Sequence, residues 1–174
     1  MSGPGEQYSF GKTISWALYD WANSAFATTV MAGFFPVFFK QYWSQGTDPT
    51  VSTFQLGLAN SLGSVLVAAL APILGAIADR GGARKRFLGF FAVMGIVMTG
   101  AMPLVAQVQW VMAAVLYVVA SVGFAGANIF YDSLIVLVAP EEKRDVVSAL
   151  GFAMGYLGGG LLFAVNVLMT LNPG

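Results

Sequence analysis

Two long apolar runs of the chain are joined by the sequence Gly75-Ala-Ile-Ala-Asp-Arg-Gly-Gly-Ala-Arg-Lys-Arg86. This stretch contains four of the eight Lys and Arg residues of the chain. Its glycines allow the backbone to turn sharply and allow helices to approach closely. Asp79 is expected either to accept hydrogen bonds from Arg80 or Arg84 or to cap the N-terminus of a helix. The stretch therefore predicts a stiff, charged turn between two membrane-spanning helices.

The composition is that of an integral membrane protein. Of the 174 residues, 57% are hydrophobic and 9% are charged, whereas a soluble domain carries about 25% charged residues. The formal net charge is zero and the basic residues are clustered, so we expect no nucleic-acid partner. The sequence contains no Cys and no His, the residues that supply thiolate and imidazole ligands to metal ions. We therefore expect no metal and no cofactor, and any proton chemistry would use carboxylates or tyrosines.

Five apolar runs are long enough to cross a bilayer, which requires about 20 residues of helix. The runs extend much further than a buried strand would, and no segment alternates with a period of two. We predict an all-α integral membrane protein with helices at about 14–39, 53–78, 87–105, 110–138 and 146–169. Residues 1–13 are expected to form an N-terminal tail, and residues 14–174 the transmembrane domain.

The distribution of basic residues predicts the orientation in the membrane. If the N-terminus lies inside, the outer segments contain Lys40 alone, and the inner segments contain the others: Lys12, Arg80, Arg84, Lys85, Arg86, Lys143 and Arg144. Cytoplasmic loops carry the excess of Lys and Arg. We therefore expect a cytoplasmic N-terminus and a last helix that ends outside.

Two acidic residues lie within apolar runs, where an unpaired carboxylate costs at least about 2.5–3.5 kcal/mol. Each belongs to a Tyr-Asp pair and has an Asn about one helical turn deeper in the membrane. The two groups are Tyr19, Asp20 and Asn23 in the first helix, and Asn128, Tyr131 and Asp132 in the fourth. This arrangement is typical of a cavity site for a substrate or a coupling proton. The alternative is a structural role, in which each Asp binds a neighbouring helix end or a loop arginine.

Glycines and aromatic residues also predict packing. Gly151, Gly155 and Gly159 recur every four residues in the fifth helix, a spacing that favours close packing of another helix, with a hinge as the alternative. The aromatic residues of the first helix are expected mostly to face lipid or the membrane interface, with a cage for a cationic substrate as the alternative. They are Trp21, Phe26, Phe34, Phe35, Phe38 and Phe39.

The charged turn, with Gly75, Asp79, Arg80, Gly82 and Arg84 in order between two spans, resembles the signature loop after the second helix of major facilitator superfamily transporters. Three other segments of the chain resemble those of one branch of the superfamily, the branch related to autophagy-associated vacuolar amino-acid effluxers. These segments are Trp16 to Lys40, Tyr131-Asp-Ser-Leu134 and Pro140-Glu-Glu-Lys-Arg144. Members of the superfamily have twelve helices, built from inverted three-helix repeats. The resemblance implies that this chain is a fragment with one repeat and two helices of its inverted partner, and that its partner is the missing C-terminal half.

The resemblance implies a secondary active transporter of a small polar solute, with amino acids as the suggested class. It would lie in a bacterial inner membrane and work by alternating access, with the 75–86 loop as a conformational latch. Two features of the family's antiporters are missing: the fourth helix lacks the arginine of many proton-coupled members, and the fifth helix lacks the usual proline. These departures speak against a drug/proton antiport mechanism. One alternative is a non-transporting scaffold or an inactive fragment. The two Tyr-Asp pairs on separate helices also resemble an intramembrane aspartyl protease. This is only a minor alternative, because the sequence lacks the Gly-x-Gly-Asp second site and the Pro-Ala-Leu segment of those enzymes. We therefore expect that the chain is not an enzyme.

Overall fold

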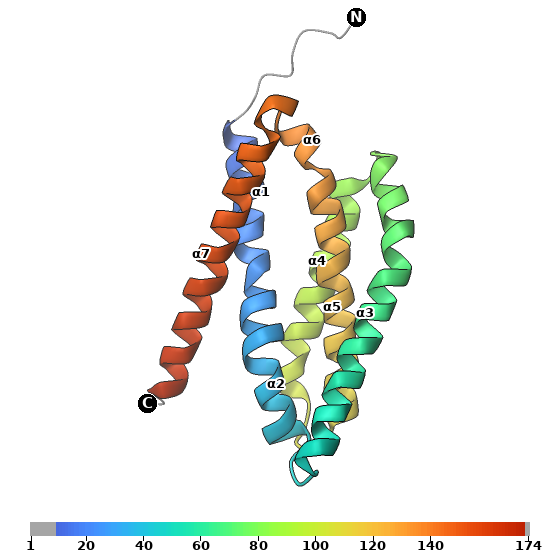
Figure 1. Cartoon of the computed structure of the whole chain (residues 1–174), viewed down its shortest axis with the longest axis vertical. Coiled ribbons are helices and arrows are strands. Elements are labelled where there is room, and N and C mark those ends of the chain that lie inside the picture. Colours follow the sequence, from blue (N-terminus) through green and yellow to red (C-terminus); the bar gives the residue numbers. More distant parts are fainter. Residues whose placement is uncertain (1–9, 173–174) are drawn as a thin grey trace, which may run out of the picture. The chain divides into compact units, whose positions relative to one another are not determined.

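The computed structural model describes residues 10–172, and within that range the elements are helices without a strand. Residues 1–9 of the predicted tail and residues 173–174 lie outside the described residues. The elements, shown in Figure 1, are α1 (Phe10–Ala25), η1 (Phe26–Phe34), α2 (Phe35–Phe38), η2 (Phe39–Trp43), α3 (Pro49–Asp79), α4 (Arg84–Ala101), η3 (Met102–Leu104), α5 (Trp110–Ser133), α6 (Ile135–Val138), η4 (Glu141–Lys143) and α7 (Arg144–Leu171).

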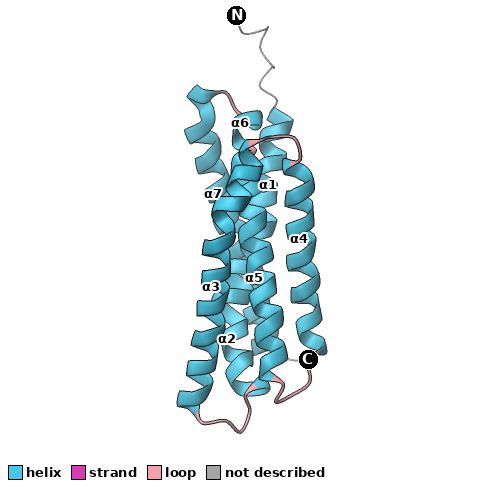
Figure 2. Cartoon of the chain, turned by 90° about the vertical axis from the view of Figure 1, so that its right-hand side faces the viewer, coloured by secondary structure: helices cyan, strands magenta, loops and turns pink. Residues whose placement is uncertain are grey.

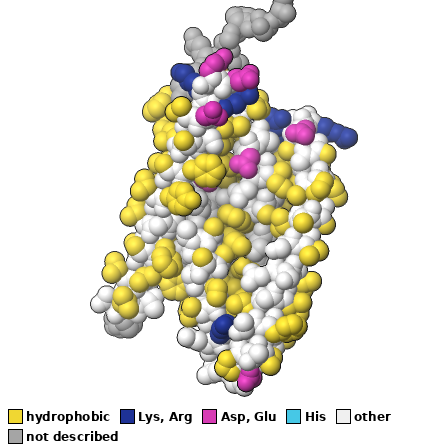
Figure 3. Space-filling model, viewed as in Figure 1, with side chains coloured by type: hydrophobic (Ala, Val, Ile, Leu, Met, Phe, Trp, Pro, Cys, Tyr) yellow, Lys and Arg dark blue, Asp and Glu magenta, His cyan; other side chains and the backbone are white. Residues whose placement is uncertain are grey.

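Five helical stretches are long and apolar enough to cross a membrane, which confirms the predicted all-α membrane fold. They comprise Phe10–Trp43, Pro49–Asp79, Arg84–Leu104, Trp110–Val138 and Glu141–Leu171. The first begins and ends beyond both predicted boundaries, so residues 10–13 of the predicted tail are helical. Figure 3 shows hydrophobic side chains along the helices and charged side chains mostly at helix ends, as expected where lipid is the solvent.

The chain forms two compact units. Unit 1 contains α1, the start of η1 up to Thr29, and the segment from Leu134 onward, in which α1 packs along α7. Unit 2, residues Val30–Ser133, contains α3, α4 and α5, with α5 packed against both other helices. Figure 2 shows that short loops join these helices.

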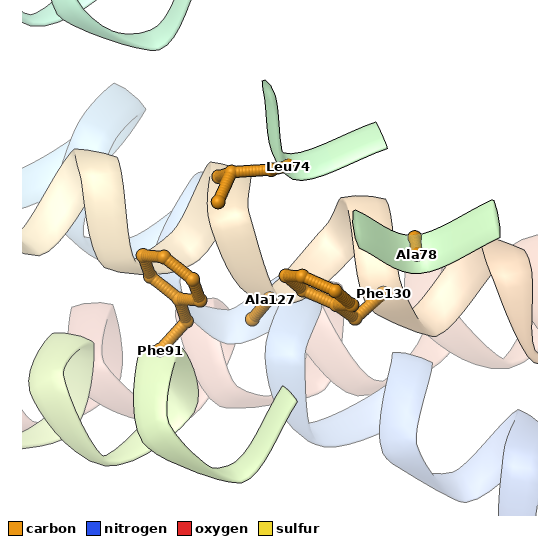
Figure 4. Packing of buried hydrophobic residues seen from close by; sticks show 5 residues of the cluster. All are labelled: Leu74, Ala78, Phe91, Ala127 and Phe130. Atoms are coloured by element: carbon orange, nitrogen blue, oxygen red, sulfur yellow. The ribbon is translucent and has the colours of Figure 1, made fainter. Parts of the chain in front are cut away.

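The buried core of unit 2 lies where α3, α4 and α5 meet. It consists of Leu74, Ala78, Phe91, Ala127 and Phe130, which point toward one another in Figure 4. The ring of Phe130 is stacked on the rings of Phe87 and Phe91, with centroids 5.1 and 6.0 Å apart. Stacked rings at these separations are favourable beyond the area that they bury.

Glycines bring the backbones of α4 and α5 into contact. A Cβ atom on Gly123 would lie 2.7 Å from the Gly95 amide nitrogen and 2.9 Å from the Phe91 carbonyl oxygen. A Cβ atom on Gly126 would lie 2.6 Å from the Phe91 ring. Helices in lipid lack a hydrophobic force between them and depend on such close contact of small residues.

The C-terminal part of the first span, from Val30 onward, also packs within unit 2. Phe35 is stacked on Tyr117 of α5 at 3.9 Å, and the Tyr117 hydroxyl donates to Oδ1 of Asn60 on α3 at 2.9 Å. The Trp43 indole donates to the Val105 carbonyl oxygen at 3.3 Å. Phe35 and Phe39 are 3% and 0% exposed, so the expectation that these two rings face lipid is wrong.

The first span contains two π-helical segments, η1 and η2, on either side of α2. A π-helix has i→i+5 hydrogen bonds, is rare, and usually extends for a single turn. Pro36 lies between the two segments and has no amide hydrogen to donate to an α-helical bond. Residue Thr29 in η1 is the last of unit 1 and Val30 the first of unit 2, so the wide helix coincides with the change of packing partners.

We expect Gly123→Ala to destabilise the protein, because its Cβ atom would meet backbone atoms that cannot move aside. The free energy of unfolding in detergent should fall by about 1–3 kcal/mol, the usual cost of overpacking. Gly100→Ala in α4 is the matched control, because nothing lies within 4 Å of its Cβ position. That change should be neutral or stabilise by up to about 1 kcal/mol, since Ala favours helix. Equal effects of the two substitutions would contradict the close contact.

We expect the Asp48 carboxylate to make stability depend on acidic pH. Asp48 caps α3 and accepts the Thr50 amide hydrogen at 2.8 Å, and this hydrogen bond lowers the pKa of the carboxyl group. The stabilisation is present above the ordinary pKa of an Asp and is lost as the pH falls through the lowered value. Asn is also a good N-cap. Asp48→Asn should therefore retain the cap and remove this part of the pH dependence of the thermal unfolding midpoint.

Candidate functional site

The charged turn joins α3 to α4 through one residue with a positive φ angle, Gly81. Gly81 has a φ of 77°, a left-handed conformation that favours glycine. A Cβ atom on Gly75 or Gly82 would meet nothing within 4 Å. The conformational requirement therefore falls on Gly81, which belongs to the glycines expected to allow the turn but not to the residues predicted to form the latch. Two adjacent glycines signal a turn, but the letters alone do not show which of them has positive φ.

Arg84 holds the turn closed. Its Nε atom donates to the carbonyl oxygen of Ala78 at 2.6 Å, and its guanidinium group lies over Gly81. Ala78 is 2% exposed and belongs to the core of unit 2. A cation at the C-terminal end of a helix is favourable, because the last carbonyl groups carry partial negative charge. The turn is thus fastened directly to the packed core.

The turn leaves Asp79 and Arg80 exposed. The expected hydrogen bond from Arg84 to the Asp79 carboxylate is replaced by the bond to the Ala78 carbonyl oxygen. The alternative expectation, that Asp79 caps the start of a helix, is also wrong, because Asp79 is the last residue of α3. A carboxylate at a helix C-terminus is electrostatically unfavourable.

Asp20 lies in unit 1 on the face of the first span that is packed against α7. Its carboxylate is half-buried and is hydrogen-bonded by the Ser24 hydroxyl group. One turn further on, the Thr28 hydroxyl lies 3.0 Å from the Ser24 carbonyl oxygen and 3.2 Å from the Gly159 carbonyl oxygen on α7. Three oxygen-bearing side chains spaced by four residues therefore follow one helix face.

The α7 face opposite these side chains is made of glycine. A Cβ atom on Gly155 would lie 2.7 Å from an Asp20 carboxylate oxygen, and one on Gly159 would lie 2.8 Å from the Thr28 hydroxyl oxygen. Gly158 touches the Trp21 backbone, and Gly151 is buried. Gly158 also packs here, in addition to the predicted Gly151, Gly155 and Gly159, because a residue three positions after Gly155 lies on the same helix face.

The second predicted group lies in unit 2, near the end of α5. Asp132 is exposed, whereas Tyr131 is buried and Asn128 half-buried. In the first group, Tyr19 and Asn23 are half-buried. The two groups belong to different units, so a cavity shared by Asp20 and Asp132 stays a prediction.

Among residues 10–172, no group of three or more His, Cys, Asp or Glu side chains could hold a metal ion. The candidate site is therefore composed of carboxylates, hydroxyl groups, amides and backbone carbonyl oxygens.

Comparison with known proteins identifies relatives over most of the chain. The chain is 39% identical over 158 residues to the uncharacterized MFS-type transporter YxiO of Bacillus subtilis strain 168, a match that covers 90% of this chain and 37% of YxiO. It is 26% identical over 151 residues to an uncharacterized protein of Aquifex aeolicus strain VF5, with 86% and 36% covered. No solved structure matches. The chain spans little more than a third of the length of these relatives.

A family model supports the same assignment. Residues 46–142, more than half of the chain, match the model described as "Vacuole effluxer Atg22 like". This region includes α3, α4, α5 and the charged turn. The chain therefore belongs to the Atg22-like vacuole effluxer family of MFS-type transporters.

Proposed function

We propose that this chain is the N-terminal part of a secondary active transporter that moves a small polar solute by alternating access. The observation that carries the proposal is the 39% identity to an MFS-type transporter over 90% of the chain. Amino acids are the first substrate class to test, because the signature segments resemble those of vacuolar amino-acid effluxers. A carrier is favoured over an enzyme because YxiO and the matching family are described as a transporter and an effluxer.

The pairing of helices within each unit supports an inverted repeat. If the first span corresponds to the fourth and the second to the fifth, the contact between α1 and α7 is equivalent to that between α5 and α3. Both contacts are present, each within its own unit. In this proposal the remaining length of the relatives supplies the other helices of the pathway.

The proposed orientation has the N-terminus in the cytoplasm of a bacterium, in the inner membrane. The turn between α3 and α4 carries Arg80, Arg84, Lys85 and Arg86, whereas Lys40 is in the last turn of η2, at the opposite end of the first span from the N-terminus. Such asymmetry is typical of cytoplasmic loops. Both named relatives are bacterial.

The charged turn acts in this proposal as a latch. Arg84 fastens the turn to the core, and Asp79 and Arg80 remain at the surface for a partner beyond this chain. The position of Asp79 at a helix C-terminus does not benefit α3, which favours a role outside the helix. That partner would be the C-terminal half in one conformational state of the transporter. Gly75, Gly82 and Gly81 supply the backbone geometry.

The membrane-embedded acids supply the proposed contacts with solute or proton. Asp20 is accompanied by Tyr19 and Asn23, and Asp132 by Asn128 and Tyr131. Carboxylates within spans normally face a cavity or a partner, because lipid is a poor environment for them. The Ser24 hydroxyl group beside Asp20 is a further candidate.

Transport by the complete protein tests the substrate class. Proteoliposomes that contain the full-length transporter should accumulate a radiolabelled amino acid faster than empty vesicles, with a dependence on the ion gradient. Failure with every amino acid, while other small polar solutes are transported, would reject the class but keep the carrier. Failure with all solutes would favour a scaffold.

In the same assay, we expect Asp79→Asn to lower turnover about tenfold while KM changes less than about threefold, because the latch affects the conformational equilibrium and not the solute site. Asp48→Asn, at the other end of the same helix, is the matched control and should transport normally. A wild-type turnover number for Asp79→Asn would exclude the latch.

A further inference from the structure

We infer that Gly155 of α7 is a positioning residue for Asp20. The absence of a side chain at this position allows the Asp20 carboxylate and the Ser24 hydroxyl group to lie together against the backbone of α7. The inference rests on the proposed role of Asp20 in solute or proton contact. It adds that a neighbouring helix, and not only the helix that carries the acid, determines where the carboxylate lies.

The contacts at Gly155 are specific to these two side chains. A Cβ atom there would lie 2.6 Å from the Ser24 hydroxyl oxygen, 2.7 Å from Asp20 Oδ2 and 3.2 Å from Asp20 Cγ. Real Cβ atoms essentially never approach other atoms within 3.0 Å. An alanine at position 155 would therefore displace the carboxylate, the hydroxyl group or α7 itself, and would disturb the hydrogen bond between Ser24 and Asp20.

The neighbouring glycines face other groups. A Cβ atom on Gly158 would overlap the Trp21 carbonyl oxygen and indole ring. One on Gly159 would meet the Thr28 side chain and the Ser24 carbonyl oxygen, and one on Gly160 would meet nothing within 4 Å. A substitution at each of these glycines therefore disturbs a different environment. Gly155 faces the carboxylate, Gly158 and Gly159 face the packed first span, and Gly160 faces open space.

The charged groups of unit 1 lie away from this contact. On α7, Arg144 and Asp145 are ten or more residues before Gly155, which corresponds to about 15 Å along the axis. The α7 side chain next to Gly155, Tyr156, is 79% exposed. The other titratable groups of the described elements in unit 1 are Lys12 and Tyr19 on α1, and Glu141, Glu142 and Lys143 in η4. The part of α7 that lies nearest to the Asp20 carboxylate is thus the backbone at Gly155.

This geometry has a direct consequence for proton binding. A carboxylate that touches a helix backbone and one hydroxyl group gains or loses much of its local stabilisation when that helix shifts. Gly155 therefore makes the protonation of Asp20 sensitive to the register between α1 and α7. A larger residue would move the acid out of this position without removing it.

Carbodiimide labelling tests the inference in the full-length transporter, without knowledge of the solute. Dicyclohexylcarbodiimide reacts with protonated carboxyl groups in apolar surroundings, and mass spectrometry measures the labelling of Asp20 relative to Asp132 across about pH 5 to 8. We expect Gly155→Ala to change this ratio about fivefold at the most sensitive pH, the factor that corresponds to one ordinary hydrogen bond. Gly160→Ala should leave it within about twofold, the scatter of a surface substitution.

Gly158→Ala distinguishes positioning from packing, because it disturbs α1 at Trp21 and not at Asp20. If Gly155→Ala changes the pH profile of Asp20 labelling no more than Gly158→Ala does, the inference is overturned. If Gly155→Ala does not fold, it is repeated with Asp20→Ala and Ser24→Ala, which remove the two side chains that it meets. Recovery of folding supports the inference, and continued failure overturns it.

The transport assay separates this inference from the proposed function. Normal transport by Asp20→Asn would reject the role of Asp20 in transport, whereas the effect of Gly155→Ala on labelling would still stand. Conversely, loss of transport in Asp20→Asn with unchanged labelling in Gly155→Ala would reject the positioning role alone.

Discussion

Direct contact between helix backbones is the constraint on which both units depend. In unit 2 the approach of α4 and α5 leaves no space for a side chain at Gly123, and in unit 1 the approach of α7 to the first span leaves none at Gly155, Gly158 or Gly159. Water supplies no force that brings these helices together inside a bilayer, so dispersion contacts and a few hydrogen bonds must do so. Glycine is the residue that makes such contacts close enough to be effective.

The charged turn combines a rigid base with an accessible surface. Arg84 binds the carbonyl group of Ala78, which belongs to the same buried cluster as the stacked rings of Phe91 and Phe130. The remaining charges of the turn point outward. Different residues of one short segment therefore hold the turn to the core and remain exposed at the surface.

The sequence was sufficient to predict five helices and the charged turn, because the lengths of the apolar runs and the clustering of basic residues are visible in the order of the amino acids. It was insufficient for contacts that depend on the path of the backbone. No side-chain pattern indicates that Arg84 binds Ala78 instead of Asp79, or that Gly81 and not Gly82 has positive φ. The burial of Phe35 and Phe39 is equally hard to predict, because nothing in the sequence marks the π-helical turns that change which rings of the first span face α5. The Tyr-Asp pairs are alike in sequence, but burial differs between Asp20 and Asp132.

The wide helix from Phe26 to Phe34 has a mechanical consequence for the first span. Near its N-terminal end the Thr28 hydroxyl group meets Gly159 of α7, and just beyond its C-terminal end Phe35 lies on Tyr117 of α5. If these residues formed an ordinary α-helix, the first span would become longer and its two ends would rotate relative to each other about the helix axis. The two attachments belong to different units, so a change in winding between them would leave the contacts inside each unit intact.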